Sequence, residues 1–567
     1  MSLKADTGLR FFAASVAAVT IVALAACGNH SRASTDAAPA SPSRALILRR
    51  GTDPAPEYSQ TPATALDDVL TYHNNAARTG LQPYETILTP ANVNPSSFGR
   101  LFSDQVDGFV NAQPLYVAGV RIPGKGRRNV VYVATENDSV YAFDADKPGP
   151  PLWHDRLLDG GTPVTSAQVN CGQIVPRMGI TGTPVIDLAT NTLYVVAMIR
   201  RKEAGKAVYQ QMLHALDIRT GAEKLGGPVA ISASVPGTGA GSVNGRVPFD
   251  PFSYVNRAGL ALSHGVVYIG FSSHCDLGNY HGWLFAYNAR TLARRAVFNV
   301  TPNGSQGAIW ETGDAPAIDS KGNIYVLTAN GTFDAASGGK DYGDSFLKLS
   351  LEGNQLRPID FFTPYDQQML NVKDLDVGSG GAVLLPKQPG SHRRLIVGEG
   401  KNAVLYLVNR ERMGGFNPKG NPQVVQEISG NLNANFSTPA FWDGNLYLGP
   451  LNQPLQDFRL KDGRFSPTPS CETPNPFIYP GTTPAVSSDG NKNAIVWALE
   501  DSGYLSGKPT VLYAYDAKDI SNELYSSAHD SSRENADPAV KFTTPTIAHG
   551  RVYFGTEDHL DVYGLFR

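Results

Sequence analysis

The sequence predicts an all-β protein whose main part is a single eight-bladed β-propeller. Eight segments share one strand–turn–strand pattern, and apolar and small residues alternate with period two within their strands. The composition also suits short strands joined by turns: 57 glycines, 40 prolines, 24 tyrosines and 24 phenylalanines occur among 567 residues, and only 17% of the residues are charged. A closed ring of blades protects the strand edges that an open stack would expose.

Each repeat is expected to begin with a short strand, often opened by proline, followed by a turn and a second strand with an aromatic residue near its start. Clear examples are "TGTPVIDLATNTLYVVA" from Thr181 and "GDAPAIDSKGNIYVLTA" from Gly313. A third, alternating strand follows, as in "GWLFAYNART" from Gly282. The repeats start near Ala112, Thr181, Ala258, Gly313, Gly381, Ser437, Thr482 and Thr543. We expect the last strand, "LDVYGLFR", to share a blade with strands from the N-terminal end of the ring.

The N-terminus reads as an export signal. Lys4 and Arg10 precede an apolar run that ends in small residues and is too short for a comfortable membrane span. "LAAC" ending at Cys27 resembles the lipobox of bacterial lipoproteins, which implies cleavage before Cys27 and a lipid on its thiol. A plain secretory signal is the alternative.

The predicted organisation is a signal peptide over 1–26, a flexible tether over 27–65, rich in Ala, Ser, Pro and Thr, and the propeller over 66–567. The resemblance to lipoproteins implies an exported protein that is lipid-anchored in the bacterial cell envelope, on the periplasmic face of the outer membrane or at the cell surface.

Charge and cysteine usage narrow the function classes. The net charge is −3 and no basic run is present, so a nucleic-acid partner is not expected. Apart from Cys27 the chain has Cys171, Cys275 and Cys471, so at most one pair can form among these three, and the sequence leaves the pairing open. There is no CxxCH motif for covalent haem.

The stretch "SSHCDLGNYH" from Ser272 concentrates His274, Cys275, Asp276 and His281. Zinc prefers such ligands, but it needs them at tetrahedral reach, and side chains of sequence neighbours diverge on an extended chain. The sequence therefore disfavours a zinc site here.

The blade pattern resembles that of quinoprotein dehydrogenases, which bind pyrroloquinoline quinone (PQQ). "ALDIRTGAEKL" from Ala215 is similar to their blade motif, with Leu225 in place of a tryptophan. "DLGNYHGWLFAYN" resembles a segment that carries a Ca²⁺ ligand, which implies this role for Asp276, with Ser273 contacting the quinone. "IWETGDAPAIDSKGNIYVLTANG" resembles the segment with a quinone-stacking tryptophan and a Ca²⁺-binding asparagine, which implies Trp310 and Asn330.

Two further segments resemble parts of the same site. "GGKDYGDSFLKLSL" from Gly338 is similar to the stretch with an aspartate that serves as Ca²⁺ ligand or base; Asp341 and Asp344 both fit, and Asp341 is preferred. "GKNAVLYLVNR" from Gly400 implies that Lys401 contacts the quinone carbonyl. Asp341 and Lys401 are thus the expected catalytic residues.

A weaker match, "NCGQIVPRMG" from Asn170, places a quinone-binding arginine at Arg177. Two features depart from the family. Cys171 stands alone where the family has a vicinal cysteine pair, and Asn111 stands where it has an acidic residue.

The resemblance implies a PQQ- and Ca²⁺-dependent dehydrogenase that oxidises an alcohol or a sugar hydroxyl and passes electrons to a separate acceptor. The alternative is a cofactor-free propeller lipoprotein that binds a protein or glycan or acts as a scaffold in the envelope, because function lies in the site and not in the fold. The two hypotheses differ in whether Asp276, Asn330, Asp341, Trp310 and Lys401 meet in one axial site.

Overall fold

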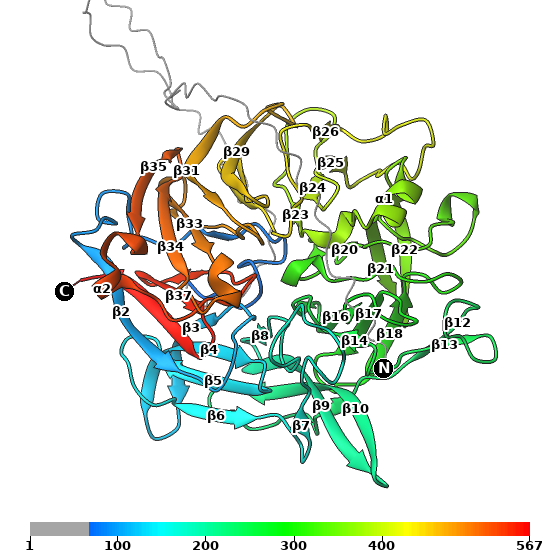
Figure 1. Ribbon diagram of the computed structural model, residues 1–567, viewed down its shortest axis with the longest axis horizontal. Helices are drawn as coiled ribbons and strands as arrows, with labels where there is room; N and C mark the ends of the chain where they lie inside the picture. Colours follow the sequence, from blue (N-terminus) through cyan, green and yellow to red (C-terminus); the bar gives the residue numbers. More distant parts are fainter. Residues whose placement is uncertain (1–66, 567) are drawn as a thin grey trace, which may run out of the picture.

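The computed structural model describes residues 67–566 and confirms the eight-bladed propeller: antiparallel blades follow one another around a central axis (Figure 1). The first strands of neighbouring blades contact each other, as expected for strands closest to the axis. The predicted signal peptide, the tether and Cys27 lie outside the described residues. Within residues 67–566, no helix is both long enough and apolar enough to cross a bilayer.

Each blade is a sheet built on four main strands. The first blade contains β3 (Leu115–Ile122), β4 (Gly126–Thr135), β5 (Ser139–Asp144) and β6 (Trp153–Arg156), and the second contains β8 (Val185–Asp187), β9 (Thr192–Glu203), β10 (Lys206–Asp217) and β11 (Val229–Ala230). The third, fourth and fifth blades contain β15 (Ala261–Ser263), β16 (Val266–Ser273), β17 (Trp283–Asn288) and β18 (Arg294–Asn299); β19 (Ala317–Ile318), β20 (Ile324–Leu327), β21 (Phe346–Glu352) and β22 (Gln355–Phe362); and β23 (Ala382–Leu384), β24 (Leu395–Glu399), β25 (Leu405–Asn409) and β26 (Gln426–Ile428), respectively. The sixth, seventh and eighth blades contain β27 (Ala440–Trp442), β28 (Asn445–Leu448), β29 (Gln453–Lys461) and β30 (Arg464–Phe465); β32 (Ala485–Asp489), β33 (Lys492–Glu500), β34 (Val511–Asp516) and β35 (Asp519–Ser526); and β36 (Thr546–Ala548), β37 (Arg551–Gly555), β38 (His559–Leu565) and β2 (Phe98–Gln105), respectively.

Short additional elements decorate the ring. The strands are β1 (Leu81–Gln82) on β32, β7 (Thr162–Pro163) on β9, β14 (Tyr254–Val255) on β16, β31 (Cys471–Phe477) on β29, and a hairpin of β12 (Ser234–Pro236) and β13 (Arg246–Pro248). The helices are α1 (Gln367–Lys373), α2 (Ser531–Glu534) and the 3-10 turns η1 (Glu311–Gly313), η2 (Ala335–Ser337), η3 (Val377–Ser379), η4 (Ser502–Leu505) and η5 (Ser527–Asp530).

The ring is closed by strands from both ends of the chain. β2 pairs antiparallel with β38, in a register that runs from Phe98 opposite Leu565 to Gln105 opposite His559. This confirms the expectation that the C-terminal strand shares a blade with an N-terminal one.

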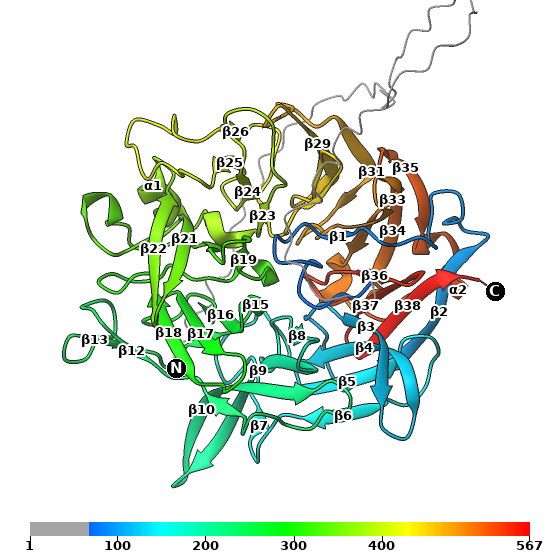
Figure 2. The ribbon, with the colours of Figure 1, turned by 180° about the vertical axis from the view of Figure 1, so that it is seen from behind.

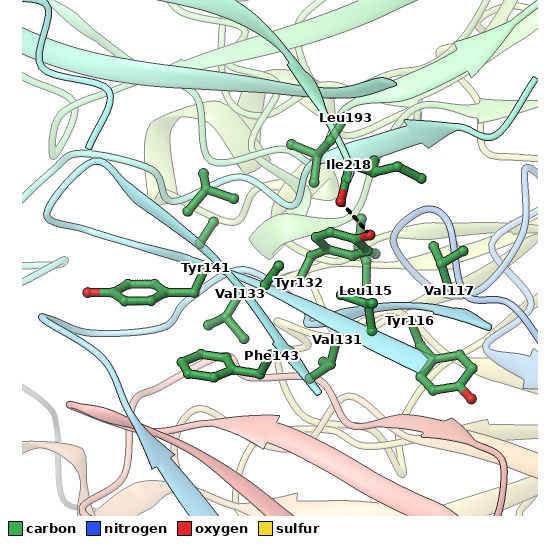
Figure 3. Close-up of a cluster of buried hydrophobic side chains, with 14 of the residues drawn as sticks. Leu115, Tyr116, Val117, Val131, Tyr132, Val133, Tyr141, Phe143, Leu193 and Ile218 are labelled. Carbon is green, nitrogen blue, oxygen red and sulfur yellow. Dashed lines mark hydrogen bonds between the residues drawn. The ribbon is translucent and has the colours of Figure 1, made fainter. Parts of the chain in front are cut away.

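The aromatic residue near the start of the second strand explains part of the repeat. The hydroxyl of Tyr132 on β4 donates to the carbonyl of Ile218 in the next blade at 2.9 Å, within a cluster that also contains Val133 and Leu193 (Figure 3). The Tyr447 and Tyr553 hydroxyls donate likewise to Ala517 and Ala145 of the following blades. These tyrosines stabilise blade-to-blade packing, since each fills an apolar interface and satisfies a backbone carbonyl.

An N-terminal segment, residues 69–85, runs around the axis on the face shown in Figure 2, and we call it the N-terminal belt. Its contacts with the eight blades follow chain order. The hydrogen bonds join Val69 to Tyr116, Leu70 to Ile186, Thr71 to Leu260, Ala76 to Ile318, Ala77 to Leu384, Thr79 to Phe441, Gly80 to Val486 and Glu85 to Gly550. The buried Arg78 guanidinium adds donors to the carbonyls of Ala315 and Pro316 in the fourth blade.

Candidate functional site

Two sets of loops meet on one face of the ring: those that join the second and third strands of a blade, and those that connect one blade to the next. They share a face because the strands of a blade run antiparallel. Side chains from connections of several blades contact each other there, which is possible only near the axis. The candidate site lies among these side chains.

The centre of the site is a group that we call the axial carboxylate cluster: Asp344, Asp374 and Asp376 with Asn330 and Lys401. The Lys401 ammonium lies 2.9 Å from Asp374 Oδ1 and 2.5 Å from Asp376 Oδ2. The Asn330 amide nitrogen donates to Asp374 Oδ1 at 2.8 Å, and its backbone N–H donates to Asp376 Oδ1 at 2.9 Å. Loops of the fourth and fifth blades thus converge on one charged centre.

Burial sets the electrostatics of this cluster. It raises the pKa of Asp376 against the opposing charge of Lys401, and it raises the pKa of Asp344 well above the usual range, with the Asp376 charge adding to the effect. Burial disfavours the charge of Lys401 too, but the carboxylates of Asp376 and Asp374 outweigh it and raise the lysine pKa. Asp374 differs from the others because its side chain is 69% exposed, against 7% for Asp376.

One acceptor in the cluster has no partner. Among the described residues, Asn330 Oδ1 is buried and makes no hydrogen bond, although the amide nitrogen and the backbone N–H of the same residue do. A buried oxygen without a donor is costly, and it calls for an ion or water beside it. With two buried carboxylates nearby, this donor set fits a hard cation, which prefers oxygen ligands.

Asp276 approaches the cluster from the third blade. Ser273 Oγ donates to Asp276 Oδ1 at 3.0 Å, and the Tyr280 hydroxyl donates to the same atom at 2.7 Å. Burial raises the pKa of Tyr280, and the charges of Asp276 and Asp376 raise it further, so this phenol lies within electrostatic reach of both. Ser273 therefore orients Asp276.

Trp310 connects the carboxylate cluster to a group of half-buried aromatic side chains. Lys401 Nζ lies 5.9 Å from the Trp310 ring centroid, and the Phe436 ring lies 6.2 Å from it. We call the group the axial ring cluster; its members are Trp310, Phe436, Tyr479, Tyr504 and Phe542, with successive centroids 5.7 to 6.4 Å apart. The rings come from four blade connections and one loop, and all five residues are only partly buried.

Among the described residues, Asp341 and Arg177 form no hydrogen bond or salt bridge with the axial carboxylate cluster. The carboxylate of Asp341 accepts from the backbone N–H of Asn303 at 3.0 Å, whereas Asp344 is the one that interacts with Asp376 and Lys401. The geometry thus favours Asp344, the alternative that the sequence left open, over the preferred Asp341. The reason is local: Asp341 closes the 334–342 loop through backbone hydrogen bonds with Asp334.

Arg177 lines a cavity of about 300 Å³ between the first, second and eighth blades, together with Asp107, Glu557 and Asp558. Its backbone N–H faces Glu136, a buried acid whose pKa burial raises and which accepts from Asn111. Glu136 therefore supplies a carboxylate beside Asn111, the position where the family's acidic residue is missing. Glu136 lies in the stretch "TENDS", which has the sequence of an ordinary hairpin turn. In the structure this stretch does form the turn between β4 and β5.

The histidine–cysteine stretch does not form a metal centre in the described part of the chain. Cys275 forms a disulfide with Cys171, 104 residues earlier, which settles the pairing that the sequence left open. The ring nitrogens of His281 face the carbonyls of Thr301 at 2.9 Å and Ala240 at 2.8 Å. These residues tie loops of the second and third blades together.

Asp374 and Asp376 are the site residues that sequence reasoning missed. They precede a first strand in "KDLDVGSGG", a short acidic turn without a distinctive pattern. The one indication in the sequence was that two aspartates, separated by a single residue, precede the first strand of a blade.

Comparison with known proteins supports the fold. No protein-family model and no curated protein sequence matches the chain. Among solved structures, the chain is similar to the quinohemoprotein alcohol dehydrogenase ADHIIG from Pseudomonas putida HK5, with a TM-score of 0.55 and 14% identity over 90% of this chain and 82% of that one. A second similar structure is the quinohemoprotein alcohol dehydrogenase from Comamonas testosteroni, with a TM-score of 0.54 and 16% identity over 88% of this chain and 80% of that one. A third is a europium-containing methanol dehydrogenase, with a TM-score of 0.53 and 13% identity over 88% of this chain and 98% of that one.

These similarities show that the chain has the propeller fold of the quinoprotein alcohol and methanol dehydrogenases, as the sequence resemblance predicted. At this level of identity they establish the fold alone. The function has to be argued from the site itself.

Proposed function

We propose that the chain is an exported quinoprotein dehydrogenase. It oxidises the hydroxyl of an alcohol or sugar with PQQ and a bound cation, and it passes the electrons to a separate acceptor. The observation that carries this proposal is the axial carboxylate cluster, in which a buried oxygen without a donor among the described residues, Asn330 Oδ1, lies beside acids, while Lys401 of the same cluster lies over the half-buried indole of Trp310.

The cation is held by oxygen atoms. Asn330, Asp344 and Asp376 would supply it with ligands, and Asp276 would add one from the third blade. Ca²⁺ takes six to eight oxygens, and a nearby cation favours the charged form of acids whose pKa burial has raised. One structural neighbour is a europium-containing enzyme, so a trivalent ion belongs in the test as well.

The quinone would lie against Trp310, because a half-buried, planar indole suits stacking of a planar ring. When bound, PQQ supplies the carbonyl group that accepts electrons from the substrate. Lys401 lies between the carboxylates and the indole, so its ammonium is placed to donate a hydrogen bond to that carbonyl.

Asp374 is the proposed base. Its side chain is the most exposed acid of the cluster, so a substrate hydroxyl can reach it, and it accepts hydrogen bonds from Asn330 and Lys401 that keep it oriented. A carboxylate in this position takes the hydroxyl proton as the alcohol is oxidised.

The decisive experiment is reconstitution of the purified protein with PQQ and either Ca²⁺ or Eu³⁺, followed by absorbance spectra and dye-linked oxidation of alcohols and sugars. We expect a quinone spectrum and activity with at least one metal, and a loss of about a hundredfold or more in activity for Asp374→Asn. Asp341→Asn is the comparison variant, because Asp341 lies outside the cluster and is the acid that the sequence resemblance preferred as base. No quinone spectrum at saturating PQQ would refute the proposal and favour the cofactor-free binding or scaffold alternative.

The lipid anchor at Cys27 is a separate part of the proposal and rests on the lipobox resemblance. Metabolic labelling with palmitate in a bacterial host is expected to mark the wild-type chain and to leave Cys27→Ala unlabelled. Equal labelling of both chains, or of neither, would contradict the anchor.

A further inference from the structure

The axial face contains two buried cations without an acidic partner, Arg257 and Lys541. Their residues are only 3% and 6% exposed. Arg257 donates to the backbone carbonyls of Thr181, Thr312 and Phe542, and its Nε has no partner. Within residues 67–566, the Lys541 ammonium donates only to the side chain of Gln173, at 3.2 Å. Neither makes a salt bridge within residues 67–566, whereas Lys401 nearby is paired with two carboxylates.

The surroundings of Lys541 are aromatic. Its ammonium lies 5.1 Å from the Phe542 ring centroid, 5.2 Å from that of Tyr504 and 5.9 Å from that of Tyr479. The Arg257 guanidinium lies 5.8 Å from the Phe542 ring. The three rings are half-buried, so a ligand that enters the axial face meets ring faces and the ammonium together.

The acids near Lys541 and Arg257 do not offset the positive charge of these two residues. Asp501 and Glu136 are the acids that influence Lys541 through space, but burial raises the pKa of both well above their usual range. Asp501 accepts from Thr543, and Glu136 accepts from Asn111. Burial and the neighbouring Arg257 charge lower the pKa of Lys541 to about 8. Burying charge without a partner is costly, so this arrangement is one that a bound anion would stabilise.

We propose that Lys541, with Arg257 behind it and the axial ring cluster around it, binds the carboxylate of a ring-bearing ligand. Lys541 donates to the carboxylate, Arg257 adds positive potential from beneath Phe542, and the exposed ring faces stack on the ring of the ligand. The ligand carboxylate belongs either to a planar cofactor such as PQQ or to a ring-bearing acid that enters as substrate. Binding of this kind requires neither the cation nor a redox reaction, so it is independent of the proposed dehydrogenase activity.

The affinity should depend on pH in a defined direction. Lys541 must be protonated to hold the anion, so the affinity falls as pH rises through about 8. The bound carboxylate in turn favours the ammonium and shifts this fall to higher pH. Titration of Tyr479 and Tyr504 does not interfere, because burial raises the pKa of both hydroxyls, that of Tyr479 to about 12.

The test is calorimetric titration of the full chain in EDTA at pH 7 with naphthoate and with its neutral counterpart naphthalenemethanol. We expect naphthoate to bind at least about tenfold more tightly than the neutral compound, and Lys541→Met to remove that preference. Lys541→Arg should keep it. The matched control is Lys508→Met, which removes an exposed lysine on a neighbouring loop. Equal binding of the two compounds, or unchanged naphthoate affinity in Lys541→Met, would overturn the inference.

A third titration distinguishes the two sources of the carboxylate. If naphthoate and PQQ compete, the site receives the carboxylate of the cofactor. If naphthoate binds PQQ-loaded protein undiminished, it receives that of a substrate. A folding check accompanies the series: Lys541→Met should melt no lower than the wild type, because it removes an unpaired buried charge, while a lysine with only a structural role would lower the melting temperature.

Discussion

Replacement of Lys401 by methionine tests whether the axial carboxylate cluster is a site built around positive charge. The change removes the ammonium and keeps most of the apolar stem. Three acids, Asp344, Asp374 and Asp376, then remain together with no cation among them. Lys340→Met is the matched control, because Lys340 is exposed on a nearby loop and its loss changes the net charge equally.

The magnitude follows from the burial of the two partners. The contact with Asp374, which is 69% exposed, is worth at most about 1 kcal/mol, as for surface pairs. The contact with Asp376, which is 7% exposed, lies in the range of buried pairs, for which loss of one partner costs about 3–5 kcal/mol. We therefore expect Lys401→Met to lower the free energy of unfolding by about 3–5 kcal/mol at pH 8, and Lys340→Met to change it by less than about 0.5 kcal/mol.

The pH dependence has a definite sign. A carboxyl whose folded pKa is raised holds its proton in the folded state, so its burial destabilises the protein progressively as pH rises from the unfolded pKa through the folded one. Without Lys401 the pKa values of Asp376 and Asp344 rise further. The stability gap between wild type and Lys401→Met should therefore widen from pH 5 to pH 8.

Urea unfolding followed by tryptophan fluorescence measures these differences, first in EDTA and then with Ca²⁺. Added Ca²⁺ should stabilise Lys401→Met more than the wild type, because it replaces the lost charge. A destabilisation below about 1 kcal/mol at pH 8 in EDTA, or a gap that narrows as pH rises, would refute the reasoning.

Three further predictions concern stability, and urea unfolding checks each of them. The double replacement Cys171→Ser and Cys275→Ser should cost about 2–4 kcal/mol, and a loss below about 1 kcal/mol would contradict a stabilising role for this disulfide. Asp457→Asn should stabilise the protein at pH 8, on the order of 2 kcal/mol, because burial raises the pKa of Asp457 to about 7; the gain should shrink as pH falls toward the unfolded pKa of about 4, where both states hold the proton, and an equal gain at pH 8 and pH 4 would contradict it. Arg78→Met should cost at least about 3 kcal/mol, since it leaves buried carbonyls without donors, and a loss under 1 kcal/mol would show that the belt is held by its backbone alone.

The propeller was predictable because its signals are local and repeated. Strand alternation, opening prolines and second-strand tyrosines such as Tyr132 recur in blade after blade, and each repeat satisfies the same interface. The N-terminal belt was not predictable, since its residues pair one by one with strands far along the chain and show no period. The Cys171–Cys275 pairing could not be predicted for the same reason, because the disulfide joins loops that come close together only in the assembled ring.

The candidate site was predictable in part. Asn330, Trp310 and Lys401 stand in segments with recognisable surroundings, and the fold brings all three together. Asp374 and Asp376 lie in a turn that any solvent-exposed loop could contain. Their importance comes from the contact that both make with Lys401 and from the burial of Asp376, and both are properties of the folded state.

The N-terminal belt also limits how this protein can evolve. Propellers commonly gain or lose blades through duplication, because each blade is a similar unit. Here a single strip of chain, residues 69–85, contacts the eight blades in succession, and Arg78 and His73 add further hydrogen bonds to the fourth and seventh blades. In a ring of nine blades, one blade would have no contact with the belt. In a ring of seven blades, one contact site of the belt would have no blade to bind. A change in the number of blades would therefore also require a change in the belt that contacts each of them.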